Sequence, residues 1–249
     1  MQRYYTRACN FYFGNQSKTL VNKRKSIPLH QIKEISFDHV EIITRKKIRR
    51  ISINQVKKLP NNLKKKINAD IKKINSKKEN FSNFNFKKIP NILGVLNLTP
   101  DSFSDGGKFN KKNKGIFHAI SLYKSGASII DVGGESTRPG SKPVSEKQEW
   151  NRINKILKLI VKKIPISLDT RKSRIMENGI RMGVKLINDV SGLSYDPKTI
   201  NILKKYKIPF VIQHSVGTPE NMQKKAKYKN ELLDIYDYFE DKIKLIRSK

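Results

Sequence analysis

Residues 97–107 carry more chemically active side chains than a turn of the chain requires. An amide, two carboxylates, serine hydroxyls and a Gly pair follow the apolar run 92–96, which is short enough to be a buried strand. Proline, Asp, Ser and Gly form turns readily, but an ordinary turn needs only a few of them. This excess of polar groups indicates that the loop binds a ligand or a metal ion.

Four further apolar stretches end in the same way, with carboxylate, amide, hydroxyl or imidazole groups at their carboxyl ends. These stretches are 128–132, 164–168, 184–187 and 208–212. Segments with helical spacing of apolar residues lie between them, at about 115–126, 146–162, 171–182 and 198–206. Strands that alternate with helices predict parallel βαβ units. Enzymes with parallel sheets hold their chemistry at the carboxyl ends of the strands, so we expect these polar residues to form one site.

The polar loops at 97–107, 130–140, 167–170 and 187–192 resemble the successive signature loops of dihydropteroate synthases. The resemblance covers about residues 91–223. It implies a TIM barrel that joins a dihydropterin-6-ylmethyl diphosphate to p-aminobenzoate, which gives the folate precursor dihydropteroate and releases diphosphate. We therefore predict an α/β protein in which a partial TIM (β/α)8 barrel of about five βα units follows a small α+β N-terminal extension.

The resemblance assigns the first loop to a metal ion and to the reacting centre. Asn97 is then the ligand of a Mg²⁺ ion that also contacts the substrate diphosphate, and Mg²⁺ commonly completes its shell with water and phosphate. Asp105 is a catalytic residue that holds the loop over the reacting centre, and Phe103 forms an aromatic wall for p-aminobenzoate. Without the resemblance, a strand-end Asn is more simply explained as a cap on the turn.

The resemblance places the second loop beside the diphosphate and the aminobenzoate. Thr137 contacts the pterin diphosphate, whereas Arg138 and Pro139 lie beside the aminobenzoate, with Arg138 as a second catalytic residue. A guanidinium group offers a planar pair of donors that suits phosphate or carboxylate. In another context, an isolated exposed Arg would simply be solvated.

Asp169 and Asn188 are the residues best suited to recognise a pterin ring. A carboxylate accepts hydrogen bonds from ring N–H groups, and an Asn amide serves both donor and acceptor positions. The alternative for each is a hydrogen bond between the strand end and the backbone. Gln213 stands where the family usually has a Met that packs on the pterin, so we expect it to pack on the ring or to hydrogen-bond to it. We expect the neighbouring His214 to be structural or to support the residues that contact the ligand.

Length and composition limit the class of protein. A chain of 249 residues with 37% hydrophobic content can bury a core, which argues against a disordered protein. No stretch approaches the roughly 18 apolar residues of a membrane-spanning helix, so we expect no membrane partner. The single cysteine, Cys9, excludes an internal disulfide and fits a reducing compartment, so we expect a cytoplasmic protein.

The chain is strongly basic, with a net charge of +32. The charge is +18 over residues 1–90 and +14 over the remainder. A basic protein can bind nucleic acid or anionic membranes through release of counterions. The basic residues are mostly Lys, however, and are spread among many Asn and Ile, as in a global compositional bias. We therefore favour a protein without a nucleic-acid partner, in which the positive field attracts anionic substrates.

The first part of the chain differs from the barrel-like part. Alternating apolar residues at 36–43 and 48–53 predict a hairpin, and helical spacing over 54–75 predicts an amphipathic helix. We therefore divide the chain into a basic N-terminal extension at 1–88, a hairpin plus a helix, and a pterin-binding barrel at 89–249 that is incomplete at its C-terminus.

Three later motifs of the family are absent: strand ends with Asp-Pro-Gly, Ser-Arg-Lys and Arg-Val-His. A predicted helix at 231–249 is the last segment, whereas a closed barrel needs eight βα units. We therefore expect residues 1–249 to be a fragment, a shortened gene product or one half of a two-chain assembly, inactive or nearly so alone. The partner that supplies the missing strands would be another copy in a homodimer or a complementing chain.

Three other functions remain open from the sequence. A pterin-dependent methyltransferase barrel also has Asp and Asn residues at its strand ends. That family, however, lacks a long first loop such as the one at 97–107 in this chain. A basic RNA- or membrane-binding protein would use residues 1–90, and salt-sensitive retention of RNA would favour it. The third is an inactive fragment that still binds a pterin.

Overall fold

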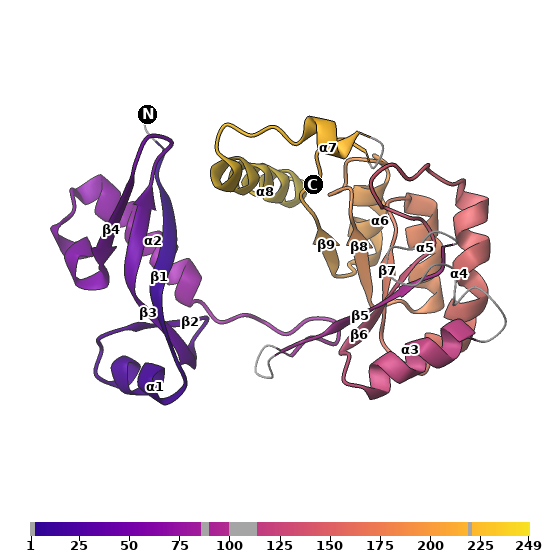
Figure 1. The fold of residues 1–249 in the computed structure, drawn as a ribbon, viewed down its shortest axis with the longest axis horizontal. Coiled ribbons are helices and arrows are strands. Elements are labelled where there is room, and N and C mark those ends of the chain that lie inside the picture. Colours follow the sequence, from indigo (N-terminus) through magenta and orange to yellow (C-terminus); the bar gives the residue numbers. More distant parts are fainter. Residues whose placement is uncertain (1–2, 86–89, 100–113, 219–220) are drawn as a thin grey trace. The chain divides into compact units, whose positions relative to one another are not determined.

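The chain folds into two compact units, residues 1–79 and 80–249 (Figure 1). The computed structural model describes residues 3–85, 90–99, 114–218 and 221–249. The sequence suggested a boundary after residue 88, but the chain already joins the second unit before that point. Ser82 Oγ donates to the carbonyl of Lys185 at 2.8 Å, and Asn83 Nδ2 donates to the carbonyl of Ser128 at 2.6 Å. These bonds reach across more than forty residues, so local sequence patterns do not reveal them.

The first unit is a four-stranded antiparallel sheet with two α-helices and a short 3-10 helix. In chain order the elements are β1 (Tyr5–Phe13), α1 (Gly14–Asn22), β2 (Ile27–Leu29), β3 (Ile32–Ile43), β4 (Ile48–Ser52), η1 (Ile53–Lys58) and α2 (Asn61–Asn75). Strand β3 lies at the centre and pairs with β1, β2 and β4. Pro60 precedes α2 and so divides the predicted helix at 54–75 into η1 and α2.

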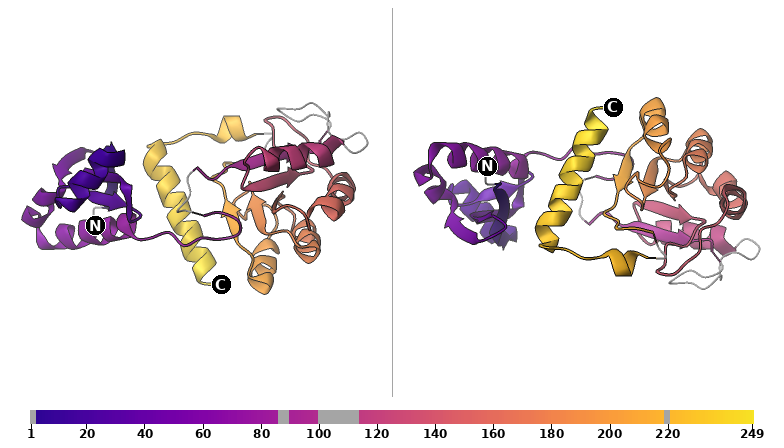
Figure 2. Two further views of the ribbon diagram at one scale, coloured as in Figure 1. Left: turned by 90° about the horizontal axis from the view of Figure 1, so that it is seen from below. Right: turned by 90° about the horizontal axis from the view of Figure 1, so that it is seen from above.

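The second unit contains five parallel strands in the order β5-β6-β7-β8-β9. They are β5 (Leu93–Asn97), β6 (Ile129–Gly133), β7 (Ile166–Asp169), β8 (Leu186–Asp189) and β9 (Phe210–Ile212). The helices between them are α3 (Lys114–Lys124), α4 (Glu146–Ile160), α5 (Ser173–Met182) and α6 (Thr199–Tyr206). These four helices lie on one side of the curved sheet, as Figure 2 shows, whereas β9 is followed by the C-terminal helices. This α/β arrangement is that of a partial TIM barrel and confirms the predicted fold class.

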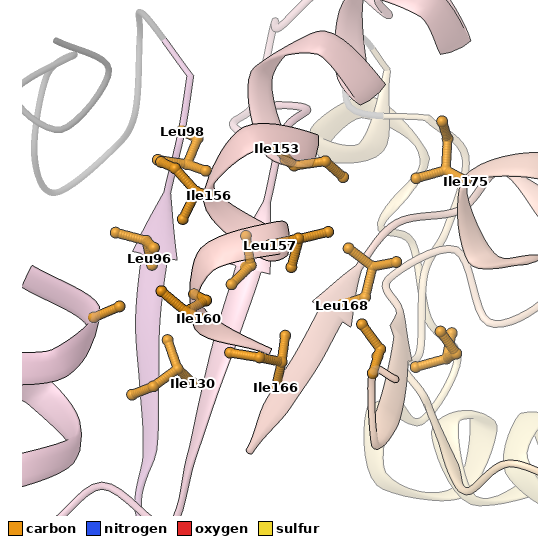
Figure 3. Packing of buried hydrophobic residues seen from close by; sticks show 14 of the residues in the cluster. Leu96, Leu98, Ile130, Ile153, Ile156, Leu157, Ile160, Ile166, Leu168 and Ile175 are labelled. Carbon is orange, nitrogen blue, oxygen red and sulfur yellow. The ribbon is translucent and has the colours of Figure 1, made fainter. Parts of the chain in front are cut away.

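Helix α4 shows how the sequence builds the layer of helices outside the sheet. Ser145 caps the N-terminus of α4 in a capping box with Gln148. In this box the backbone N–H of Gln148 donates to Ser145 Oγ at 3.2 Å. Apolar residues at helical spacing then turn one face of α4 inward, and Ile153 and Leu157 are fully buried. Figure 3 shows these side chains against Leu168 and the other apolar residues of the strands. The packing fixes the strands and therefore the positions of their carboxyl ends.

Two further helices end the chain, α7 (Met222–Lys225) and α8 (Glu231–Arg247). Asn230 caps α8, since its Oδ1 accepts the amide of Leu233 at 3.1 Å. The Tyr238 hydroxyl of α8 donates to the carbonyl of Gln213 at 3.1 Å, so this helix lies close to the carboxyl end of β9. Within the described ranges, no helix is both long and apolar enough to cross a membrane.

Candidate functional site

The carboxyl ends of four neighbouring strands place four residues in a single row. Asn97 of β5 pairs with Gly133 of β6, Gly133 pairs with Asp169 of β7, and Asp169 pairs with Asn188 of β8. Paired residues in a parallel sheet direct their side chains to the same face. Asn97, Asp169 and Asn188 therefore share one face of the sheet, as the site prediction required.

The glycine in this row opens space between two polar side chains. A Cβ atom at Gly133 would lie 3.2 Å from Asp169 Oδ2 and 3.6 Å from Asn97 Oδ1. Because Gly133 has no side chain, these two oxygens face the same small space from the strands on either side. This small space, the gap at Gly133, is bordered by an amide oxygen and a carboxylate oxygen.

The carboxylates of the site lie in an environment that disfavours their ionised forms. Burial raises the pKa of Asp169 well above the ordinary value, and the nearby Asp131 and Glu149 raise it further. Burial also raises the pKa of Asp131, although the hydrogen bond from Asn188 opposes part of that effect. Such closely spaced carboxylates retain protons more readily than a solvated Asp, and a ligand with N–H donors would favour their ionised forms.

Hydrogen bonds on both sides fix the amide of Asn188. Its Nδ2 donates to Asp131 Oδ2 at 2.9 Å, and its Oδ1 accepts from Gln213 Nε2 at 3.4 Å. The amide group has two N–H donors and two lone pairs, so it can still donate one hydrogen bond and accept another. Gln213 thus contributes to the site by orienting the amide of Asn188. Asp131, at the middle of its strand, supports the same amide from below the row.

The loop after β6 carries the next group of predicted residues. Thr137 is half-buried, whereas Arg138 and Pro139 are exposed. The loop is held in a compact turn, because Ser141 Oγ donates to the carbonyl of Ser136 at 2.7 Å. Asp105 and Phe103, the other predicted site residues, lie in residues 100–113, outside the described part of the chain.

A buried charge cluster, which the sequence analysis did not single out, lies beside the strand ends of β6 and β7. It comprises Glu135, Glu149, Arg171 and Lys172. Lys172 Nζ lies 2.8 Å from Glu135 Oε1 and 2.6 Å from Glu149 Oε2, and Arg171 Nε donates to Glu135 Oε2 at 2.8 Å. The sequence did contain a signal for this cluster, because Glu135 follows β6 and Arg171 and Lys172 follow β7. Glu149 gave no such signal, because a Glu in the first turn of a helix is ordinary.

His214 has a packing environment, as predicted. Its ring meets the ring of Tyr238 edge-on at 4.7 Å between centroids, and the rings of Tyr228 and Phe239 lie within 6.4 Å. The imidazole therefore joins the segment after β9 to helix α8.

The donor atoms at the gap suit a Mg²⁺ ion that takes few protein ligands. Asn97 Oδ1 and Asp169 Oδ2 are hard oxygen donors, the type that Mg²⁺ prefers. In the ranges that the structure covers, no three His, Cys, Asp or Glu side chains gather to form a complete metal cage. An ion held mainly by water and phosphate would need no more from the protein than the one amide oxygen that Asn97 offers.

The chain is similar to known dihydropteroate synthases in sequence and in structure. It is 36% identical over 166 residues to dihydropteroate synthase of Synechocystis, a match that covers 66% of this chain and 57% of that protein. The dihydropteroate synthase of Yersinia pestis in a sulfonamide complex superposes with a TM-score of 0.61 at 35% identity, over 64% of this chain and 58% of the other. The enzyme of Clostridium difficile with pteroic acid gives a TM-score of 0.58 at 38% identity, over 66% and 61%.

The family match falls on the unit that carries the row of site residues. The chain spans less than two thirds of the length of each of these relatives. The family model described as "pterin binding enzyme" matches residues 93–249, which include all five parallel strands and the loops between them. The chain therefore belongs to the pterin-binding enzyme family.

Proposed function

We propose that the protein is a dihydropteroate synthase of folate biosynthesis. It joins a dihydropterin-6-ylmethyl diphosphate to p-aminobenzoate and releases diphosphate. The observation that carries this proposal is the row of Asn97, Asp169 and Asn188 around the gap at Gly133. The relatives named above bear this enzyme name, and one of them was crystallised with pteroic acid.

The row is suited to hold a pterin through its hydrogen-bonding edge. Asp169 accepts from a ring N–H and the exocyclic amine, and Asn188 offers one donor and one acceptor to the remaining ring positions. Binding sites that pair buried polar groups in this way reject analogues that lack the partner, because the protein groups would be left unpaired. Gln213 supports this recognition by donating to Asn188.

The two loops form the other half of the proposed site. Thr137 binds the diphosphate, Arg138 and Pro139 border the p-aminobenzoate, and Phe103 and Asp105 cover the reacting centre. Asn97 would hold Mg²⁺, which as a Lewis acid supplies stabilisation of the departing diphosphate. The aromatic amine of p-aminobenzoate is neutral and attacks directly, so the chain needs to orient it and to exclude water rather than to supply a strong base. We expect this reaction in the cytoplasm, in line with the single free Cys9.

Calorimetry tests pterin recognition directly. The full chain is titrated with the dihydropterin diphosphate in the presence of Mg²⁺, alongside the variants Asp169→Ala and Asp241→Ala. Asp241 is an exposed residue of α8 and serves as the matched control. We expect binding by the parent chain and by the control, and a loss of about 10- to 100-fold in Asp169→Ala, because hydrogen bonds to a charged group contribute about 1.5–3 kcal/mol. Equal affinities of all three proteins would refute the assignment of Asp169.

Binding of a pterin without turnover is the second candidate for residues 1–249. The described residues form five parallel strands, and a closed barrel has eight. We therefore expect this chain alone to release diphosphate very slowly, and a second copy or a complementing chain to restore turnover by completing the barrel. Release of diphosphate by the isolated chain, measured with sedimentation to establish its oligomeric state, decides between the candidates. Turnover at the rate of a complete enzyme by a monomer would exclude the second one.

A further inference from the structure

The buried charge cluster calls for a reason other than stability. The side chains of Glu135, Glu149, Arg171 and Lys172 are each less than one tenth exposed. Removing charges from water opposes folding, and buried ion pairs are often replaceable by apolar residues without loss of stability. The geometry of these contacts, however, fixes the relative positions of the segments that carry them.

The cluster joins the two halves of the proposed site. Glu135 begins the loop after β6, and its Oε1 also accepts the amide of Val144 at 3.0 Å, where that loop leads into α4. One carboxylate thus closes both ends of the loop that carries Thr137 and Arg138. Lys172 belongs to the turn that directly follows Asp169.

Helix α4 supplies the fixed support for both segments. Glu149 is fully buried on α4, where Thr170 Oγ1 donates to its Oε1 at 2.5 Å and Lys172 Nζ contacts its Oε2 at 2.6 Å. The turn after Asp169 is therefore bound to α4 at two points. The ammonium group of Lys172 reaches Glu135 from the same position, so it links the turn, the helix and the loop.

We propose that Lys172 is a positioning residue: by bridging Glu135 and Glu149 it fixes the loop at 136–143 relative to Asp169. The inference rests on the proposed function, in which the loop binds the diphosphate and the p-aminobenzoate and Asp169 binds the pterin ring. Loss of the bridge then separates the two halves of the site without altering the row at the strand ends. Ligands of the loop lose affinity, whereas the pterin ring does not.

The test uses a variant that leaves no new unpaired charge. Lys172→Met with Glu149→Gln removes both contacts of the ammonium group, keeps an acceptor for Thr170 and leaves Glu135 paired with Arg171. Lys172→Arg retains the charge and the ability to bridge two carboxylates. The matched control is Lys205→Met with Glu177→Gln, which neutralises an ion pair of 2.9 Å on the outer helices α5 and α6.

Two measurements on residues 1–249 separate a positioning role from a structural one. Hydrogen exchange of the backbone amides of residues 136–145, including that of Val144, measures how firmly the loop is held. Calorimetry measures the affinity for a 6-hydroxymethylpterin, which lacks the diphosphate, and, in a separate titration, the affinity for inorganic diphosphate with Mg²⁺. In the Lys172→Met, Glu149→Gln variant we expect exchange of the loop to accelerate about tenfold or more. We expect affinity for diphosphate to fall about 10- to 100-fold, as is typical when a group that orients a ligand contact is removed.

The remaining outcomes are equally decisive. The pterin alcohol should bind the variant and the parent within about twofold, and Lys172→Arg should restore both the exchange rate and diphosphate binding. A uniform loss of both ligands, or an unchanged loop, would overturn the inference, as would the same effects in the control pair. If the parent chain binds no pterin at all, the proposed function fails, while hydrogen exchange still decides whether Lys172 anchors the loop.

Discussion

Asp131 and Asn188 are joined by a hydrogen bond that spans the intervening strand β7, with 2.9 Å between Asp131 Oδ2 and Asn188 Nδ2. Asp131 lies one layer deeper in the sheet than the row at the strand ends, since it pairs with Ser167 rather than with Asp169. The bond fixes which way the Asn188 amide points. The hydrogen-bonding pattern offered to a ligand therefore depends on a carboxylate that need not contact the ligand.

Asp131→Ala should weaken pterin binding because the amide of Asn188 is then free to rotate. We expect a loss of about tenfold, since one intramolecular hydrogen bond contributes about 1 kcal/mol and a buried amide is left partly unpaired. Calorimetry with the pterin diphosphate measures the change. The double variant Asp131→Ala, Asn188→Ala should lose little more than Asn188→Ala alone, and strict additivity of the two effects would contradict this coupling.

Pterin binding should weaken toward acidic pH, and it should do so above the range where an ordinary Asp titrates. The raised pKa of Asp169 means that the residue takes up a proton earlier as the pH falls, and a protonated carboxyl can no longer accept two N–H donors. Affinity is therefore expected to be full at a pH above this raised pKa and to decline as the pH falls through it. Asp131 and Asp169 titrate as an interacting pair, so the midpoint belongs to both.

A series of titrations between pH 4 and pH 9 measures this dependence. Asp169→Asn provides the control, because an amide does not titrate in this range. Its binding should be weak at every pH and should lack the acidic decline. An identical decline in the variant would assign the titrating group to Asp131 or to the ligand instead of Asp169.

Gly133→Ala should block the site with little harm to the fold. The added Cβ would lie 3.2 Å from Asp169 Oδ2, which forces the carboxylate to shift by a few tenths of an ångström and fills the gap beside Asn97. We expect pterin affinity to fall by about tenfold or more, because small misplacements in a preorganised site have large effects. Gly94→Ala is the contrasting variant: its Cβ meets Ile130 Cδ1 at 3.0 Å in the core, so stability should drop while binding by the folded fraction persists.

The outer face of the sheet should depend strongly on helix α4. Leu157 is fully buried, and Leu157→Ala should lower the free energy of unfolding by about 2–5 kcal/mol through lost burial and a residual cavity. Leu159 lies two residues further along the same helix and is 50% exposed, so Leu159→Ala should change it by less than about 0.5 kcal/mol. Urea denaturation of both variants measures the difference. Similar losses in the two would contradict the packing of α4 against the strands.

Local sequence patterns were sufficient to predict the alternation of strands and helices in the second unit. Apolar runs and helical spacing are local patterns, and they located β5 to β9 and α3 to α6 to within a few residues. They also marked Asn97, Asp169 and Asn188 as polar residues at strand ends, whereas the role expected of Asn97 came from the resemblance to a known family. In the first unit the same patterns located the hairpin of β3 and β4 but gave no sign of β1, α1 and β2. Strand β2 has only three residues, the buried positions of β1 do not alternate regularly, and α1 has few apolar residues.

How the polar residues at the strand ends meet depends on the packing of the folded chain. Strand register, which no local pattern specifies, placed Gly133 between Asn97 and Asp169. Because Gly133 has no side chain, the side chains of these two neighbours border the same small space. Burial then raised the pKa of Asp169 and enclosed Lys172 between Glu135 and Glu149. Hydrogen bonds and ion pairs between residues more than twenty positions apart depend on how strands and helices pack, and that packing exists only in the folded chain.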